Sequence, residues 1–221
     1  MDDAAEVEAY ASAAAQEYLD RIDDTFVAHA LRLGLCGGRV LDLGTGPGQI
    51  PIKIAKRLPG VEIVGIDRSR NMIRQAREQA IAERLAARLQ FQIGDANRVE
   101  FPDASFDFVL CNSVLHHLEN SVRVLDDLAR VVRPGGGVLV RDLRRPSRLA
   151  FPMHVRWYGR HYTGLMKQLY IASVRSSYTA QELEKLLRAS KLRGARLFRH
   201  GRTHIGIERP VTTVADPQIS F

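Results

Sequence analysis

Short apolar runs alternate with longer amphipathic stretches over residues 39–142. Each apolar run is bounded by Gly, Pro or charged residues, which is typical of buried strands in a parallel sheet. The predicted strands are 39–43, 61–66, 89–93, 106–111 and 137–142. The stretches between them place apolar residues at helical spacing. The predicted helices are 49–58, 70–87 and 121–132. This alternation indicates a doubly wound, mostly parallel α/β sheet.

The two ends of the chain follow other patterns. Two helices are expected at 4–20 and 22–33, and the alternation lapses over 143–178. It resumes with a helix at 179–190, where Thr179 and Glu182 form a capping-box pair. Two short strands, 195–200 and 203–208, then predict an antiparallel hairpin that completes a seven-stranded sheet. We therefore expect an N-terminal helical cap (1–38) and a main domain (39–221) with a substrate lid inserted at 143–178.

Composition supports a globular protein. The chain has 221 residues, which suits one domain, and no stretch approaches the ~18 apolar residues of a membrane span. Its start, Met1-Asp2-Asp3, lacks the basic residues of a signal peptide. Cys36 and Cys111 make neither a disulfide framework nor a metal spacing, so no metal site is expected. A cytoplasmic location is the simplest interpretation, and the oligomeric state stays open.

The net charge of +7 is unevenly distributed. Residues 1–38 hold eight acids and two bases, whereas 139–209 hold sixteen bases and four acids. No acid occurs from Leu143 to Gln181, where arginines interleave with aromatic residues. Arg with aromatics can bind phosphate or carboxylate and stack on planar groups, although the same composition also suits a lid helix packed on the sheet. The segment favours a small anionic or aromatic partner over RNA.

A glycine-rich turn follows the first predicted strand. Gly44, Gly46 and Gly48 let the backbone approach a ligand at the start of the next helix. Asp67 ends the second strand, where a carboxylate can accept hydrogen bonds from both ribose hydroxyls. A dinucleotide fingerprint would place its third glycine at Gln49 instead. The spacing, with Asp42 ahead of the turn, suits an adenosine ligand that ends in a zwitterionic amino acid.

Together these residues resemble the class I S-adenosylmethionine methyltransferases, in the subfamily that includes ubiquinone and menaquinone methyltransferases. Five motifs carry the resemblance in order: Asp42–Gly48, Gly65–Asp67, Gly94–Ala96, Phe106–Leu118 and Arg133–Gly137. The resemblance implies S-adenosylmethionine as cofactor, with S-adenosylhomocysteine as product. The implied contacts are Asp42, Gly44, Thr45, Gly46 and Gly48 for the methionine part, Asp67 for the ribose, Arg68, Met72, Asp95 and Ala96 for the adenine, and Asn112 and Val114 beside the sulfonium.

Catalytic candidates lie just after the fourth strand. His116 or His117 could act as a base or orient the acceptor, and a structural role is equally open. Asp142, at the end of the fifth strand, is a weaker candidate, and Cys111 is expected to be a small apolar core residue. Candidate acceptor contacts are Tyr18, Arg144, Arg148, Trp157 and Tyr158.

The expected function is methyl transfer from S-adenosylmethionine to a small acceptor. Two alternatives remain: an RNA or protein methyltransferase that uses the basic 143–181 segment, and a non-catalytic scaffold that binds the cofactor.

Overall fold

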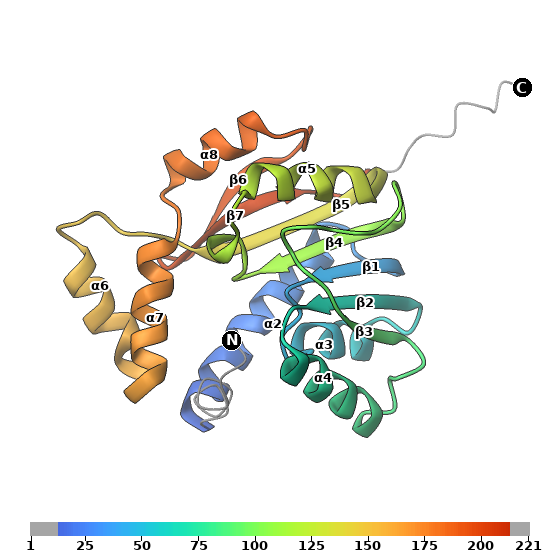
Figure 1. The fold of residues 1–221 in the computed structure, drawn as a ribbon, viewed down its shortest axis with the longest axis horizontal. Coiled ribbons are helices and arrows are strands. Elements are labelled where there is room, and N and C mark those ends of the chain that lie inside the picture. The colour runs from blue at the N-terminus through green and yellow to red at the C-terminus, as the bar shows by residue number, and fades with distance from the viewer. Residues whose placement is uncertain (1–12, 213–221) are drawn as a thin grey trace, which may run out of the picture.

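The computed structural model describes the backbone of residues 13–212 and the side chains from residue 19 to residue 212. A single seven-stranded sheet runs through it in the order β3-β2-β1-β4-β5-β7-β6 (Figure 1). The strands are β1 Gly38–Leu43, β2 Val61–Asp67, β3 Leu89–Ile93, β4 Phe106–Asn112, β5 Val132–Leu143, β6 Arg196–His200 and β7 His204–Arg209. The first five pair in parallel, and β7 runs antiparallel to both β5 and β6. The predicted sheet and its C-terminal antiparallel pair are confirmed.

Helices cover both faces of the sheet. One face packs α2 (Ala13–Arg32), α3 (Gln49–Arg57) and α4 (Arg70–Ala82), and the other packs α5 (Ser121–Val131) and α8 (Ala180–Ala189). Side chains alternate between the two faces along β1, since Val40 joins the first core and Leu41 the second. Cys111 is fully buried in the second core, as expected.

Several boundaries differ from the sequence prediction. The two helices expected at 4–20 and 22–33 are, within the described residues, one continuous helix, α2. The helix expected to reach residue 87 ends at Ala82, because Arg84 adopts a φ of 58° and Leu85 N–H bonds back to the Ala80 carbonyl. The fifth strand starts early, at Val132, because that residue pairs with Phe106 across an irregularity in the ladder.

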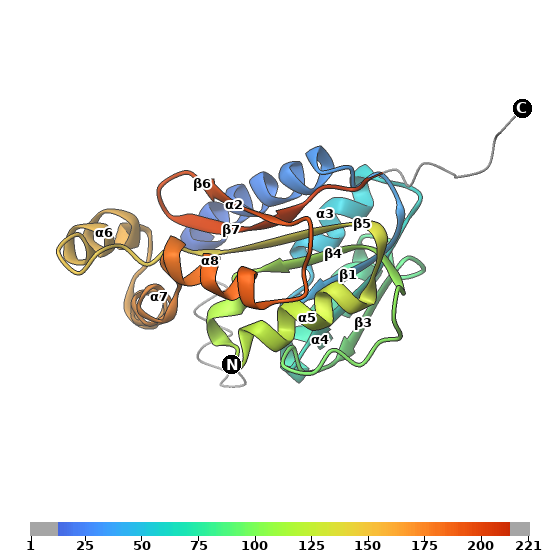
Figure 2. The same cartoon turned by 90° about the horizontal axis from the view of Figure 1, so that it is seen from above.

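The segment that lacked a clear pattern is helical. It forms α6 (Phe151–Tyr158), a 3-10 turn η2 (Gly159–His161) and α7 (Gly164–Ser176). These helices lie beyond the carboxyl ends of the parallel strands (Figures 1 and 2). Helix α7 contacts η1 (Leu115–His117), the 3-10 turn after β4, and η2 contacts α2. In the part of the chain described, no helix combines the length and apolarity that crossing a membrane requires.

Candidate active site

The glycine turn after β1 is held against the end of β2. Gly44 and Thr45 both donate their backbone N–H groups to the Ile66 carbonyl, at 2.8 and 2.9 Å. Gly44 has a φ of +71°, and a Cβ there would lie 2.3 Å from a Val114 methyl carbon. Only glycine fits at this position, and the close contact brings the loop after β4 against the turn.

Gly46 and Gly48 have different roles in the same turn. A Cβ on Gly46, at φ +53°, would lie within 4 Å of no described atom, so this position faces open space. A Cβ on Gly48 would lie 3.0 Å from both Ala76 and Phe91, so that glycine allows α3 to pack closely on α4 and β3. Of the two, Gly46 is the one placed to meet a ligand.

Three carboxyl groups converge beside the turn. Asp42 is buried at the end of β1, and its Oδ2 has no hydrogen-bond partner among the described residues. Burial raises the pKa of Asp42 to about 7, Thr45 opposes this shift, and Asp23 and Asp67 add to it. Burial also raises the pKa of Asp23 to about 6, against the attraction of Arg141 and Lys53. An uncompensated carboxyl group of this kind favours a cationic ligand.

Asp67 connects the turn to the helix that follows β2. Its Oδ2 accepts from Gly46 N–H at 3.0 Å and its Oδ1 from Ser69 N–H at 2.9 Å. The Ser69 hydroxyl caps α4 by accepting from Met72 N–H. Met72 is buried, whereas Arg68 is exposed. Each carboxylate oxygen of Asp67 retains a lone pair for a further donor.

The adenine candidates after β3 lie in a tight turn. Asp95 is exposed, and its Oδ1 accepts from both the backbone and the side-chain N–H of Asn97, at 2.9 and 3.0 Å. Asn97 in turn accepts from Glu119 N–H at 2.9 Å. Ala96 is half-buried against the second core. Asp95 thus shapes its own turn and still presents its second oxygen to solvent.

A buried arginine organises the end of β4. Arg141, on β5, is fully buried and donates to Asn112 Oδ1 (2.9 Å), Thr25 Oγ1 (2.9 Å) and the Ile22 carbonyl (3.1 Å). Burial lowers its pKa to about 10, against the attraction of Asp23 and Asp142. The guanidinium therefore ties α2 to Asn112. No sequence motif points to Arg141 or Asp23, because the residues they contact are distant in the sequence.

Two catalytic candidates that are 26 positions apart in the sequence, His116 and Asp142, are in contact in the structure. His116 Nδ1 lies 2.6 Å from Asp142 Oδ1, and both side chains are only 2% exposed. Asp142 also accepts backbone N–H groups from His116 (2.9 Å) and Leu143 (2.7 Å). A carboxylate that accepts these bonds makes Nδ1 the protonated ring nitrogen and leaves a lone pair on His116 Nε2. That atom is buried and has no hydrogen-bond partner among the described residues.

His117 lies over His116, with ring centroids 3.9 Å apart. Although part of its surface is exposed, burial and the adjacent His116 lower the pKa of His117 to about 4. Ser113, just before this turn, holds a φ of +59° and donates its N–H to the Arg141 carbonyl. A residue other than glycine in this conformation is strained by about 1–2 kcal/mol, so the surrounding contacts hold the loop in place.

The acceptor candidates of the inserted segment lie farther out. Arg144 is directed away, since its guanidinium donates to the Arg202 carbonyl in the β6–β7 turn. Arg148 and Trp157 are exposed, and Tyr158 is half-buried against His154. The structure therefore does not bring these four residues to His116. The backbone of Tyr18 belongs to α2, but its side chain lies outside the described residues.

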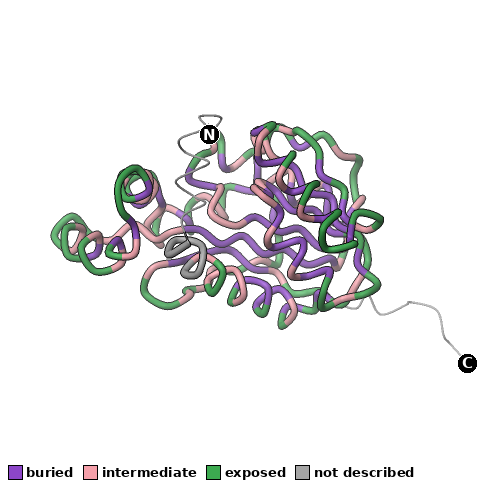
Figure 3. The backbone as a smooth tube through the Cα atoms, turned by 90° about the horizontal axis from the view of Figure 1, so that it is seen from below, coloured by how far each residue is buried: buried purple, intermediate pink, exposed green. Residues whose placement is uncertain are grey.

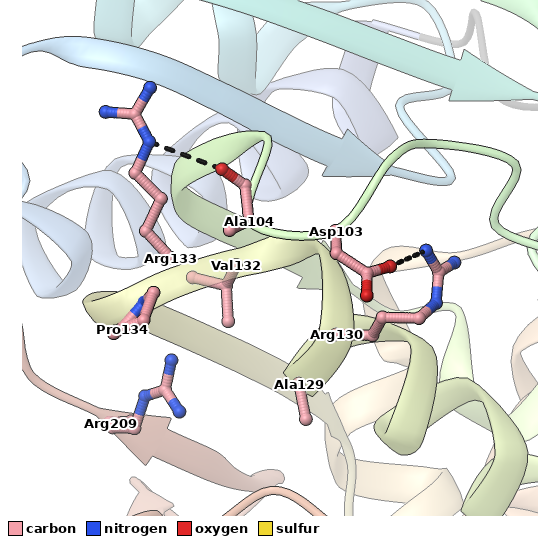
Figure 4. A pocket seen from close by; sticks show the side chains of 8 residues that line it. All are labelled: Asp103, Ala104, Ala129, Arg130, Val132, Arg133, Pro134 and Arg209. Carbon is pink, nitrogen blue, oxygen red and sulfur yellow. Dashed lines mark hydrogen bonds and ion pairs between the residues drawn. The ribbon is translucent and has the colours of Figure 1, made fainter.

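A small pocket lies at the opposite edge of the sheet (Figure 4). It has a volume of about 230 Å³ and is lined at the start of β5 by Val132, Arg133 and Pro134. Asp142 lies at the other end of the same strand, so this pocket is separate from the glycine turn and the His116–Asp142 pair.

The family assignment comes from comparison with known proteins. The methyltransferase domain family matches residues 36–191, more than two thirds of the chain. The chain belongs to this family. The sequence-based assignment to the class I S-adenosylmethionine-dependent methyltransferases is confirmed, and S-adenosylmethionine is the cofactor of that class.

Curated relatives of this chain match about half of its length. A demethylmenaquinone methyltransferase of Deinococcus radiodurans is 38% identical over 123 residues, which is 56% of this chain and 50% of that protein. A ubiquinone/menaquinone biosynthesis C-methyltransferase UbiE of Geobacter sulfurreducens is 31% identical over 123 residues, 55% of this chain and 48% of that protein. The chain thus spans about half the length of these relatives.

Solved structures support the same fold. A methyltransferase of Aquifex aeolicus, described as dependent on S-adenosylmethionine, superposes with a TM-score of 0.61 at 21% identity. The match covers 84% of this chain and 89% of that one. The match therefore extends over most of both proteins, whereas each of the two curated relatives matches about half of this chain.

Proposed function

We propose that the protein transfers a methyl group from S-adenosylmethionine to a small anionic or aromatic acceptor. The observation that carries the proposal is the buried Asp42 carboxyl group, whose Oδ2 lacks a partner among the described residues. It lies beside a glycine turn in which Gly46 faces open space. A ligand with a positive charge would relieve the repulsion among Asp42, Asp23 and Asp67.

The side chains present suit this cofactor. Asp42 and the backbone at Gly44–Gly46 would hold the amino-acid end, and Asp67 would accept from the ribose hydroxyls with its remaining lone pairs. Asp95 offers a free carboxylate oxygen to the adenine amino group. Asn112, fixed by Arg141 and facing Asp23 at 3.5 Å, would lie near the reacting end together with Val114. When bound, the cofactor supplies a methyl group already activated on a sulfonium.

The residues of the chain then have three tasks. Asn112 and Val114 would position the reacting partners. Helix α7, which contacts η1, and helix α2, which contacts η2, would exclude water from the site. His116 Nε2 removes a proton from the acceptor, where the acceptor carries one. Asp142 holds His116 in the tautomer that can do so and stabilises the positive charge that the ring gains.

The acceptor is proposed to be small because the proton-accepting group is buried. The side chain of His116 is 2% exposed, and α7 packs against the turn that carries it. Such a position would suit a slender or planar molecule better than a folded protein surface or an RNA duplex. The relatives named as quinone methyltransferases make a planar aromatic acceptor the class to test first.

Two measurements test the proposal. Calorimetry with S-adenosylhomocysteine should detect binding to the wild type, and Asp67→Ala should weaken that binding by ~10- to 100-fold, since a hydrogen bond to a charged group contributes ~1.5–3 kcal/mol. Transfer of a labelled methyl group should then be screened against planar phenols and hydroquinones. Unchanged affinity in a folded Asp67→Ala variant would contradict the cofactor assignment.

A further inference from the structure

We propose that the outer surface of α6 binds an anionic lipid bilayer. Leu149, Met153 and Trp157 are 95%, 71% and 61% exposed. Within the described residues, the other large apolar side chains of comparable exposure are scattered. These three residues, called the α6 stripe below, are spaced four apart in the sequence.

The four-residue spacing places the stripe on one side of a helix. Helical hydrogen bonding already begins before α6, because Phe151 N–H bonds to the Ser147 carbonyl and His154 N–H to the Ala150 carbonyl. Side chains at i, i+4 and i+8 then lie in a row. The buried residue of α6 is His154, which faces inward, and its Nε2 forms a hydrogen bond of 3.2 Å with the Tyr170 hydroxyl. One side of α6 thus packs on α7, and the stripe points outward.

Positive charge surrounds the stripe. Arg148, Arg156 and Arg160 are exposed, and the Arg160 guanidinium lies 4.8 Å from the centre of the Trp157 ring. No acid occurs between Leu143 and Gln181 to neutralise them. An apolar row that ends in tryptophan and is flanked by arginines is the composition of a helix that lies in the interface of an anionic membrane.

The chemistry of the stripe distinguishes lipid from other partners. Leu149 and Met153 have no aromatic ring and cannot stack on nucleic-acid bases, whereas both can insert among lipid acyl chains. If the stripe packed against the same stripe of a second copy, the flanking arginines of the two copies would repel each other. The pair α6–α7 also projects from the body and is largely exposed, so a flat surface can reach it (Figures 1 and 3).

Because α6 packs on α7, and α7 contacts the turn η1 that carries His116, binding here would hold this end of the site towards the bilayer. The site could then admit acceptors dissolved in the lipid, a consequence that rests on the proposed function. Docking itself does not rest on it and is measured without cofactor.

The test uses the only tryptophan of the chain, Trp157, as a probe within the surface itself. Vesicles of phosphatidylcholine with phosphatidylglycerol should shift its fluorescence to shorter wavelength, and brominated acyl chains should quench it. Vesicles of phosphatidylcholine alone should do neither at the same lipid concentration. Raising the salt concentration should weaken the binding.

Two variants keep the probe and change the surface. Arg156→Gln with Arg160→Gln removes two charges and should lower the partition coefficient about 30-fold, at about tenfold per 1.4 kcal/mol and about 1 kcal/mol per charge. Leu149→Ser with Met153→Ser should lower it at least tenfold. The matched controls are Arg74→Gln and Ile81→Ser, both exposed on α4, which should bind as the wild type does.

Three outcomes would overturn the proposal. Equal losses in the α4 controls would show that general charge, not the α6 stripe, is responsible. A shift that depends on protein concentration without lipid would indicate self-association, and a shift with RNA but not with vesicles would indicate a nucleic-acid partner. Normal binding of S-adenosylhomocysteine in the same samples would separate a failure of docking from a failure of the proposed function.

Discussion

His116 and Asp142 form a buried pair, with His116 Nδ1 2.6 Å from Asp142 Oδ1. The histidine follows β4 and the aspartate lies near the end of β5, adjacent parallel strands whose carboxyl ends meet at one edge of the sheet. The two backbone N–H groups that Asp142 also accepts fix its orientation, so the pair is held rigidly with His116 Nε2 directed away from it.

The pair predicts a loss of turnover without a loss of cofactor binding. His116→Gln should lower kcat by ~10²–10⁴-fold, the range for a positioned base, and Asp142→Asn should do the same by favouring the wrong tautomer of His116. His117→Gln is the control and should change kcat only a few-fold. Labelled methyl transfer with an acceptor from the screen measures kcat, and calorimetry measures affinity for S-adenosylhomocysteine. Equal activity of His116→Gln and wild type would leave the pair a structural role.

The glycine turn predicts a ligand-specific effect of a single methyl group. Gly46→Ala should weaken S-adenosylhomocysteine binding by at least tenfold because the added carbon would occupy space that the ligand needs. Gly201→Ala is a matched control, since Gly201 also has a positive φ (+59° against +53°) and also faces open space. Both variants should lose about the same unfolding free energy, roughly 1 kcal/mol from backbone strain. Similar affinities in the two variants would remove Gly46 from the site.

The raised pKa of Asp42 should make both ligand binding and stability depend on pH. With a pKa of about 7 in the folded chain and 3.8 as its ordinary value, Asp42 keeps its proton in the folded state at pH values where the unfolded chain has lost it. Its contribution to stability is therefore present below about pH 4 and is lost as the pH rises towards 7. Asp42→Asn should raise the unfolding free energy at pH 8, by up to about 4 kcal/mol for three pKa units.

The same variant should bind S-adenosylhomocysteine more weakly, because it lacks the carboxylate that attracts the ammonium group of the ligand. In the wild type, affinity for S-adenosylhomocysteine should fall by up to tenfold per unit as the pH drops below 7, because a protonated Asp42 no longer attracts the ammonium group. Calorimetry in two buffers of different ionisation enthalpy should show proton release on binding near pH 7. A wild type with pH-independent affinity between pH 6 and 8 would contradict this account.

Arg141 predicts that α2 and the sheet are energetically coupled. Arg141→Met should lower the unfolding free energy by about 3 kcal/mol, since Asn112, Thr25 and the Ile22 carbonyl lose their donor. Arg199→Met, on the exposed edge of β6, should stay within about 0.5 kcal/mol of wild type. Adding Asp23→Asn should recover part of the loss, and a double-mutant cycle from urea unfolding measures the coupling. Strict additivity would show that Asp23 and Arg141 act independently.

The sequence alone determined the sheet and the turn. Apolar runs of strand length, helical spacing between them and glycines at 44, 46 and 48 are local signals, and each specifies its own backbone conformation. Because the carboxyl ends of parallel strands share one edge of the sheet, these signals also place Asp42, Asp67 and Asn112 at that edge. The sequence pattern was least informative over 143–178, where the structure forms α6 and α7. These two helices bury few residues, so their apolar side chains do not follow a clear helical spacing.

Only the tertiary structure decided how the site is completed. The roles of Asp23 and Arg141 depend on α2 crossing the ends of β4 and β5, and the pairing of His116 with Asp142 depends on the register of two strands. Such contacts join residues that are 26 to 119 positions apart, and no periodicity encodes them. Burial then sets the chemistry: the pKa of Asp42 rises to about 7 because packing removes water from a carboxyl group that looks ordinary in the sequence.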